Sequence, residues 1–461
     1  MSPAPSDLDA LRERVRGPVF APSDDGYDEA RAVYNAMHDR RPAAVVGAVD
    51  EGDVIATVDF ARDRELDLAV RGRGHSAPGY GTCDGGVVLD LSRIRYVRVD
   101  PESRRARVGG GATIGDVDHA THAYGLAVPA GFVSTTGVGG LTLGGGIGYL
   151  NRRGGLTCDN LVSADVITSD GRRVTASPQE NPDLFWALRG GGGNFGVVTS
   201  FEFRLHPVST IVGGPIVFEL DDAADVMRAF RDHMAGAPRE LGAFFGFHRA
   251  PPLPFIPEER HLDNVCLLVT CWSGDPDEAD AALAPLRKAG RVIGEHVGPM
   301  PYPALQSAFD ALLPPGLFSY WKSDFAADLD EAAIAAHLEH GGAVPNVHSA
   351  MHIYTLGGAV ADVGPDETAF GVRDARYAVN IVGFWSDPGD TDRYRDWVRS
   401  YYDAIHPYSG FEGGYTNFME AEDQTRVREA YGPTYDRLAE VKAAWDPDNL
   451  FHLNQNIAPA V

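Results

Sequence analysis

Glycine is concentrated in one stretch of the chain, and this concentration limits the folds that the chain can adopt. The 461 residues include 53 glycines, and many lie in four clusters between Gly72 and Gly196: RGRGHSAPGYGTCDGG, VGGGATIGD, TTGVGGLTLGGGIGYLNRRGG and RGGGGNFGVV. β-Branched segments such as VVLDL separate the clusters, so the stretch is not of low complexity. Glycine lets the backbone approach a ligand closely, and unobstructed N–H groups suit an anion such as a pyrophosphate. The stretch therefore predicts a ligand site lined by backbone.

The glycine clusters differ from the two most familiar phosphate-binding loops. No cluster carries the lysine of a P-loop, and none shows the single GxGxxG motif at a strand-to-helix turn that a Rossmann fold requires. The glycines alone are therefore equally compatible with a turn-rich β domain that binds no ligand.

Short strands and helices alternate before the first glycine cluster. Residues 43–49 and 66–72 have the apolar pattern of buried strands, and residues 54–65 have that of a helix between them. This order predicts a βαβ unit that opens into the first glycine-rich loop. Helical spacing also extends through Tyr34 near the N-terminus, and residues 423–447 are predicted to form one long helix.

The length of the chain and a change of texture after Pro207 predict two domains. A single hydrophobic core usually stops growing below 461 residues. After Pro207, longer apolar strands and alanine-rich helices continue for about 200 residues, which is the size of a domain. We expect residues 1–207 to form the first domain, residues 208–404 to form the second, and residues 405–461 to return to the first.

The charge balance argues against two classes of partner. With 40 Lys and Arg against 65 Asp and Glu, the formal net charge is −25. Such a chain repels phosphate backbones and anionic lipid at long range, so we expect neither nucleic acid nor a membrane as partner. An acidic surface also serves solubility alone, so the charge identifies no partner.

Cysteine usage and the N-terminal segment indicate a cytoplasmic protein. The segment MSPAPSDLDALRERV lacks the pattern of a secretory signal. Four cysteines, Cys83, Cys158, Cys266 and Cys271, show neither a disulfide framework nor a CxxC pattern for metal. We therefore expect no metal ion.

One histidine, His75, lies inside the first glycine cluster. Gly74, Ser76 and Ala77 are small, so the imidazole can reach a bound ligand. A lone histidine is more often a hydrogen-bonded structural residue, and this alternative stays open on the residue alone.

Long motifs in a fixed order carry a family resemblance. They are RGRGHSAPGYGTCDGGVVLDLSRI, TTGVGGLTLGGGIGYLNRRGGLTCDNLVSADVITSDG, NPDLFWALRGGGGNFGVVTSFEFRLHP, YWKSDF, GGYTNF and WDPDNLFHLNQNI. Together they resemble the berberine-bridge-enzyme-like oxidases of the vanillyl-alcohol oxidase superfamily, which have a p-cresol methylhydroxylase-type FAD domain. The resemblance implies an α+β fold in which an FAD-binding domain, built from N- and C-terminal parts with mixed sheets, accompanies a substrate domain with an antiparallel sheet covered by helices.

The resemblance also implies FAD bound covalently at its 8α carbon through His75. A neutral imidazole can make this bond, which raises the flavin's redox potential and prevents its loss. The cofactor-binding residues that the resemblance implies are Arg71, Gly72, Arg73, Gly74, His75, Ser76, Thr135, Gly137, Gly140, Gly144, Gly145, Gly196, Val197, Val198, Tyr415, Asn417 and Asn454.

The chain departs from its relatives at two positions near the flavin. Many relatives hold the flavin a second time through a cysteine, and the matching position here is Val133, which has no nucleophile. Several relatives place an aromatic residue where this chain has Ala77, so the site is predicted to be roomier on that side. Cys158 is expected to be a buried core residue rather than a second attachment point. Thr136 matches a position that governs oxygen access, although a threonine in a turn is the alternative.

Catalytic candidates come from the segments that follow. The resemblance places Tyr415 and Asn417 along the flavin ring, and Tyr415 is the leading candidate for the base, provided that neighbours lower its pKa. A ring that only packs on the flavin is the alternative. Strand alternation gives the substrate-binding candidates, although a structural role is the stronger expectation for each: Tyr320, Lys322, His352 and Tyr354.

These observations predict an FAD-dependent oxidase. It would take a hydride from a small organic substrate such as an alcohol, an amine or a specialised metabolite, and pass the electrons to O2 to give H2O2. Two alternatives stay open. One is a flavin dehydrogenase with an acceptor other than oxygen, and the other is a non-catalytic protein that only binds flavin or ligand.

Overall fold

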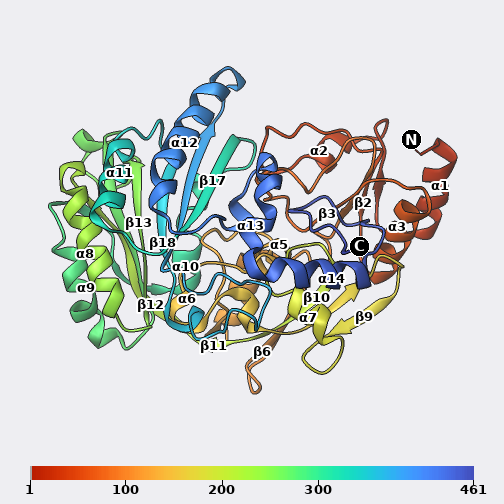
Figure 1. Cartoon of the computed structure of the whole chain (residues 1–461), viewed down its shortest axis with the longest axis horizontal. Coiled ribbons are helices and arrows are strands. Elements are labelled where there is room, and N and C mark those ends of the chain that lie inside the picture. The colour runs from red at the N-terminus through yellow and green to blue at the C-terminus, as the bar shows by residue number, and fades with distance from the viewer. Residues whose placement is uncertain (1–2) are drawn as a thin grey trace.

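The computed structural model describes residues 3–461, apart from the side chains of residue 5 and residues 423–425. Figure 1 shows two bodies side by side. One contains the N-terminal elements together with the C-terminal helices, and the other contains the middle of the chain. Mixed helices and sheets in this arrangement confirm the predicted α+β, two-domain fold class. The boundaries at residues 207 and 404 stay a prediction, because sheet membership does not show which parts fold as units.

The first sheet contains the predicted βαβ unit. Strands β2 (Ala44–Gly47) and β3 (Leu68–Arg71) both pair in parallel with β4 (Val87–Asp90), and the short β1 (Val19–Phe20) completes the sheet. Helix α3 (Glu51–Asp63) joins β2 to β3 and begins at Asp50, whose side chain accepts a hydrogen bond of 3.1 Å from the Asp53 N–H. The unit delivers the chain from β3 directly into the first glycine-rich loop.

A second, antiparallel sheet contacts helix α3 through β8. Its order is β5-β6-β10-β8-β9, and a two-stranded sheet of β7 with β11 adjoins it in sequence. The strands are β5 (Val97–Asp100), β6 (Arg105–Gly109), β7 (Leu126–Ala127), β8 (Leu161–Ile167), β9 (Arg173–Ala176), β10 (Val197–Arg204) and β11 (His206–Pro207). The helices of this half are α1 (Pro5–Arg14), α2 (Tyr27–Arg31), α4 (Ile114–His122), α5 (Val138–Leu143), α6 (Asn151–Gly154) and α7 (Pro182–Ala187).

The middle of the chain forms one large antiparallel sheet. Its order is β15-β12-β14-β13-β18-β19-β17, with β16 also paired to β12. The strands are β12 (Thr210–Phe218), β13 (Leu241–Arg249), β14 (Asn264–Trp272), β15 (Val292–Glu295), β16 (Gly298–Pro301), β17 (Phe318–Ala326), β18 (Ala350–Thr355) and β19 (Tyr377–Trp385). Helices cover its outer face: α8 (Ala223–Gly236), α9 (Ala279–Arg287), α11 (Glu331–Gly341) and α12 (Thr391–Ile405). Its inner face, near α10 (Tyr302–Gln306), is turned toward the rest of the molecule.

The C-terminal region differs from the single helix that the sequence predicts for residues 423–447. The structure has two helices there, α13 (Val427–Tyr431) and α14 (Tyr435–Trp445). Gly432 has φ of 53° and Pro433 follows it, and neither fits a helix interior. The predicted single helix was therefore wrong at this break.

The C-terminal tail is fastened to the last glycine cluster by a buried ion pair. Lys442 and Asp446 are both fully buried, 2.5 Å apart. The Lys442 ammonium also donates to the backbone carbonyls of Asn194 and Phe451, at 2.7 and 3.0 Å. The tail thus returns to the N-terminal half of the molecule.

The helix predicted to reach Tyr34 ends earlier, at Arg31. Residues 34–36 instead lie along the start of β17, where Ala36 N–H donates to the Leu317 carbonyl at 3.0 Å and Gly316 N–H donates to the Tyr34 carbonyl at 3.0 Å. The fold therefore places Tyr34 between the first glycine loop and the large sheet. No helix among the described residues is both long and apolar enough to cross a bilayer.

Candidate functional site

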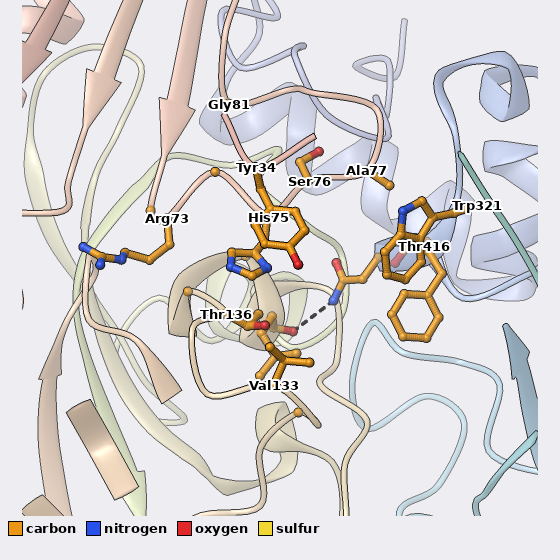
Figure 2. A pocket seen from close by; sticks show the side chains of 18 of the residues that line it. Tyr34, Arg73, His75, Ser76, Ala77, Gly81, Val133, Thr136, Trp321 and Thr416 are labelled. Atoms are coloured by element: carbon orange, nitrogen blue, oxygen red, sulfur yellow. Dashed lines mark hydrogen bonds between the residues drawn. The ribbon is translucent and has the colours of Figure 1, made fainter. Parts of the chain in front are cut away.

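A cavity of about 370 Å³ lies between the glycine-rich loops and the inner face of the large sheet. One wall comes from the glycine-rich loops, where the resemblance places a flavin, and we call it the flavin-side wall. The other wall comes from β13, β17, β18 and β19, and we call it the substrate-side wall. Figure 2 shows the centre of this cavity. The size lies in the range of small-molecule sites in proteins.

Backbone forms much of the flavin-side wall. Gly74 has φ of +75°, which strains any residue with a Cβ, so the first loop needs glycine there. A Cβ added to Gly140 or Gly193 would meet no atom within 4 Å, and both residues line the cavity. The side of each backbone that a side chain would occupy therefore faces open space, so a ligand can approach the backbone closely there.

His75 projects into the cavity from the first loop. Tyr34 stacks on its imidazole, with ring centroids 4.2 Å apart and 23° between the planes (Figure 2). Burial lowers the pKa of His75 to about 4, and the nearby Arg73 guanidinium contributes in the same direction. A hydrogen bond to the Thr135 backbone raises this pKa, but by less. The imidazole is therefore neutral at physiological pH. The contact with Tyr34 was not predicted, because no local sequence pattern relates Tyr34 to residue 75.

The Arg71 side chain makes its polar contacts within the fold. Its guanidinium is buried, pairs with Asp90 at 2.7 Å and donates to the backbone carbonyls of Ala30 and Ala32. These bonds fix the segment that carries Tyr34. Arg71 lines the cavity, but its charged end is already paired.

Most of the predicted cofactor residues share the cavity wall. Those that line it are Arg71, Gly72, Arg73, Gly74, His75, Ser76, Gly137, Gly140, Gly196, Val198, Tyr415, Asn417 and Asn454, together with the catalytic candidate Thr136.

Four predicted cofactor residues do not line the cavity: Thr135, Gly144, Gly145 and Val197. Val197 points into the opposite core because successive strand residues alternate, and Val198 takes the cavity side. Gly144 supports the site from behind, because a Cβ there would lie 2.2 Å from Asn417 Oδ1. Thr135 acts on His75 through its backbone.

Tyr415 and Asn417 meet in the cavity wall. The Tyr415 hydroxyl accepts hydrogen bonds from Gly146 N–H at 2.9 Å and from Asn417 Nδ2 at 2.8 Å. Burial nevertheless raises the pKa of Tyr415 to about 12. The lowered pKa on which its role as a base depended is therefore not present in the structure.

The structure corrects the predicted face of one strand in the substrate-side wall. His352 and Tyr354 of β18 line the cavity, whereas Tyr320 and Lys322 of β17 do not. Tyr320 donates to Glu422 and Lys322 lies 3.3 Å from the same carboxylate, on the face covered by α12. Trp321 faces the cavity in their place. One residue of register decides this face, and the motif YWKSDF alone does not fix it.

Several residues of this wall were missed by the sequence analysis. They are Phe132, Phe244, His248, Phe309, Trp321 and Asn380. These residues come from separate strands and loops, so only the strand pairing brings them together. The alternation of His248 with Phe244 along β13 was the one signal that could have suggested a shared face.

The two positions where the chain departs from its relatives both occur in the cavity wall. Val133 lies beside Thr136 and faces the cavity, and so does Ala77 (Figure 2). Cys158 is fully buried, does not line the cavity, and has a pKa raised by burial. Across the described part of the chain, no group of three His, Cys, Asp or Glu side chains could hold a metal ion.

The donor set fits a flavin. The flavin-side wall offers glycine backbone without obstructing side chains and the Arg73 side chain, which suit a pyrophosphate, and the same wall carries the neutral imidazole of His75. Together with the fold, this arrangement defines a flavin-dependent oxidoreductase.

Comparison with known proteins agrees with this class. Residues 42–177 match the family described as FAD binding domain, and residues 414–458 match the family described as Berberine and berberine like. The FAD-linked oxidoreductase YgaK of Bacillus subtilis is 32% identical, with 97% of this chain and 98% of that protein covered. The (R)-6-hydroxynicotine oxidase of Paenarthrobacter nicotinovorans is 32% identical, with 96% of this chain and 97% of that protein covered.

A solved structure shows the same architecture. The crystal structure of 6-hydroxy-D-nicotine oxidase from Arthrobacter nicotinovorans superposes with a TM-score of 0.86 at 28% identity, covering 97% of this chain and 98% of that one. The chain belongs to the berberine-bridge-enzyme-like family of FAD-linked oxidoreductases.

Proposed function

We propose that this chain is an FAD-dependent oxidase that holds its flavin through one covalent bond to His75. It takes a hydride from a small organic substrate and passes the electrons to O2 to form H2O2. The observation that carries the proposal is His75 itself, a neutral imidazole that is held by Tyr34 at the flavin-side wall of the cavity. The oxidases among its relatives support the choice of reaction.

The bound FAD would supply the hydride acceptor at the centre of the cavity. Around it, we propose that the cavity-lining residues predicted above hold the cofactor, with Gly144 and Gly145 acting as backbone supports. His75 needs no general base to become a nucleophile, because its pKa already keeps a lone pair on the ring at neutral pH. The proposal also assigns residues 1–207 and 405–461 to the FAD-binding domain and residues 208–404 to the substrate domain.

A single linkage follows from the side chains near His75. Val133 faces the cavity at the position of the second attachment in relatives, and it has no nucleophilic atom. Cys158 lies outside the cavity wall and is fully buried. We therefore assign the whole covalent attachment to His75.

The roles of Tyr415 and Thr136 follow from their contacts. Tyr415 accepts two N–H donors, which leaves its own hydroxyl proton to donate, so it orients a ligand by donating a hydrogen bond. This role replaces that of a base. Thr136 lines the cavity beside His75, and its small side chain leaves room for O2.

Oxygen consumption during turnover tests the oxidase proposal. We expect a substrate that bleaches the flavin under anaerobic conditions to drive O2 uptake in air, and catalase to return half of that oxygen. The dehydrogenase alternative predicts bleaching without O2 uptake. A flavin that no alcohol, amine or sugar bleaches would instead support a non-catalytic binding protein.

A further inference from the structure

A chain of hydrogen-bonded side chains crosses three adjacent strands on the cavity face of the large sheet. His248 Nε2 on β13 lies 2.7 Å from His352 Nε2 on β18. His352 Nδ1 lies 2.8 Å from the Tyr354 hydroxyl, and the Asn380 side chain on β19 lies near enough to lower the pKa of Tyr354. All four side chains line the cavity. We call them the His–Tyr chain.

The partners fix the direction in which protons can move. The Asn380 side chain lowers the pKa of Tyr354, although burial raises it overall, so Asn380 donates to the phenol oxygen. Asn380 is 2% exposed, and its carboxamide oxygen has no partner among the described residues. Tyr354 can then donate to His352 Nδ1, and a neutral His352 has its one N–H left at Nε2 for His248. The chain is thus ordered from Asn380 to His248.

The surroundings keep both imidazoles neutral. Burial lowers the pKa of His248 to about 4 and, with the neighbouring His248, lowers that of His352 further below its ordinary value. The rings packed against the chain, Phe132, Phe244 and Phe418, carry no charge.

Other titratable groups also lie near the chain. Tyr149 lines the cavity and interacts with Tyr354, and Cys271 and Asp310 each raise the pKa of Tyr149. His348 also lines the cavity and bonds to the Leu312 carbonyl at 2.6 Å. Of the described residues that line the cavity, none is an Asp, a Glu or a Lys, and the two arginines lie on the flavin-side wall.

We propose that the His–Tyr chain accepts the hydroxyl proton of an uncharged aromatic alcohol as the neighbouring C–H bond gives its hydride to the flavin. The proposal rests on the oxidase function above and names its base and substrate class. An aromatic body fits the wall of Phe132, Phe244 and Trp321. A substrate that must carry an ammonium group would find no carboxylate to pair with.

Each proton in this step has a donor and an acceptor. The substrate O–H bond breaks and its proton joins the Tyr354 oxygen, while the original Tyr354 proton moves to His352 Nδ1. The proton on His352 Nε2 moves to His248 Nε2, so the positive charge ends on His248. The hydride pair reduces FAD and the alcohol becomes a carbonyl. Because an imidazolium is disfavoured there, His248, which is 8% exposed, then releases its Nδ1 proton to solvent, and both imidazoles are neutral again, each in its other tautomer.

Tyr415 cannot replace this chain. Both of its bonded neighbours are N–H donors, so its own proton has no acceptor among those partners. Tyr354 differs because it lies next to His352 Nδ1, which takes the proton onward. The substrate proton therefore enters the His–Tyr chain at Tyr354.

The test is the pH profile of flavin reduction in the holoenzyme, measured by anaerobic stopped flow with benzyl alcohol. In the wild type we expect a rate constant that is independent of pH between 6 and 9. Tyr354→Phe should lower it by about 10²- to 10⁴-fold, the usual contribution of a positioned base. The log of the rate should then rise by about one per pH unit, because the alcohol must ionise unaided.

A merely structural role for Tyr354 would lower the rate but leave the profile flat, and that result would overturn the proposal. Tyr302→Phe is the matched control, because its buried hydroxyl has no partner among the described residues and does not line the cavity. It should keep the wild-type rate and profile. Bleaching of the wild-type flavin by benzylamine in preference to benzyl alcohol would overturn the substrate class.

A second readout does not depend on turnover. In ¹⁵N-histidine-labelled holoenzyme, the ring resonances of His248 and His352 should stay those of neutral tautomers from pH 8 to pH 5, and Tyr354→Phe should move the His352 Nδ1 resonance. Imidazolium signals at pH 6 would overturn the chain. If no alcohol, amine or sugar bleaches the wild-type flavin, the oxidase proposal fails and this inference fails with it. If benzyl alcohol bleaches the wild-type flavin but the pH profile of Tyr354→Phe is flat, the oxidase proposal stands and only the role of the His–Tyr chain is refuted.

Discussion

The two walls of the cavity are built in opposite ways. The flavin-side wall consists largely of backbone from segments that are themselves short and contiguous, such as residues 72–76 and 137–140. The substrate-side wall consists of single side chains, such as His248, Trp321 and His352, that project from strands far apart in the sequence. The first wall depends on conformation, and the second depends on side-chain identity and register.

This difference predicts how each wall responds to substitution. A change in the flavin-side wall should affect cofactor attachment and stability, because backbone geometry is shared by the loop and the fold. A change in the substrate-side wall should affect turnover and leave cofactor content unaltered. The following predictions separate the two effects.

The largest expected effect is on the free energy of unfolding, through the buried ion pair that holds the C-terminal tail against the last glycine cluster. Lys442→Met removes one member of a fully buried ion pair and leaves the Asp446 carboxylate unpaired. We expect a loss of about 3–5 kcal/mol in the free energy of unfolding, measured by urea denaturation of the holoprotein. Arg428→Met breaks the exposed pair with Asp436 and is the control, with a loss below about 1 kcal/mol. Equal losses in the two variants would contradict the account.

The next effect concerns the conformation of the first glycine loop. Gly74→Ala places a Cβ on a residue with φ of +75°. The strain should cost about 1–2 kcal/mol and move His75 relative to the flavin, so that covalent incorporation slows. Gly236→Ala is the matched control, because its φ is not positive, its Cβ would meet no atom within 4 Å, and it does not line the cavity. Normal incorporation in Gly74→Ala would show that the loop tolerates another conformation.

Neighbouring residues of β17 offer a sharper comparison across one strand. Trp321→Ala should lower kcat/KM by about tenfold or more, because the ring forms part of the substrate-side wall. Tyr320→Phe, on the helix-covered face, should change it by less than about threefold. Both variants should keep the wild-type flavin content. A larger effect of Tyr320→Phe than of Trp321→Ala would instead place Tyr320 on the cavity face, as the sequence predicted.

The smallest expected effect is that of pH on the rate of covalent FAD incorporation. Burial, then Arg73, lowers the pKa of His75 from 6.5 to about 4, so the folded protein keeps the imidazole neutral above about pH 5. The rate of covalent FAD incorporation into apoprotein should therefore be flat from pH 8 to pH 5 and fall only as the pH approaches 4. A rate that halves near pH 6.5 would mean that His75 titrates like an exposed histidine.

The same contrast explains what the sequence could predict. The βαβ unit and the first loop with His75 follow from local patterns, so their elements were predicted. The break at Gly432 was missed because a helical pattern of apolar residues continues on both sides of it. Tyr34 and His248 were missed because their roles depend on contacts across the fold. Tyr320 and Lys322 were placed on the wrong face because a register shift of one residue reverses every side chain.

The most direct test of the account is where the flavin is attached. After acid precipitation and proteolysis, mass spectrometry should find FAD on the peptide that contains His75 and on no other. His75→Ala should release the yellow colour into the supernatant, while His348→Ala, at another histidine of the cavity wall, should retain it. Freely extractable flavin in the wild type, or FAD on a peptide that contains Cys158, would contradict the single histidyl attachment.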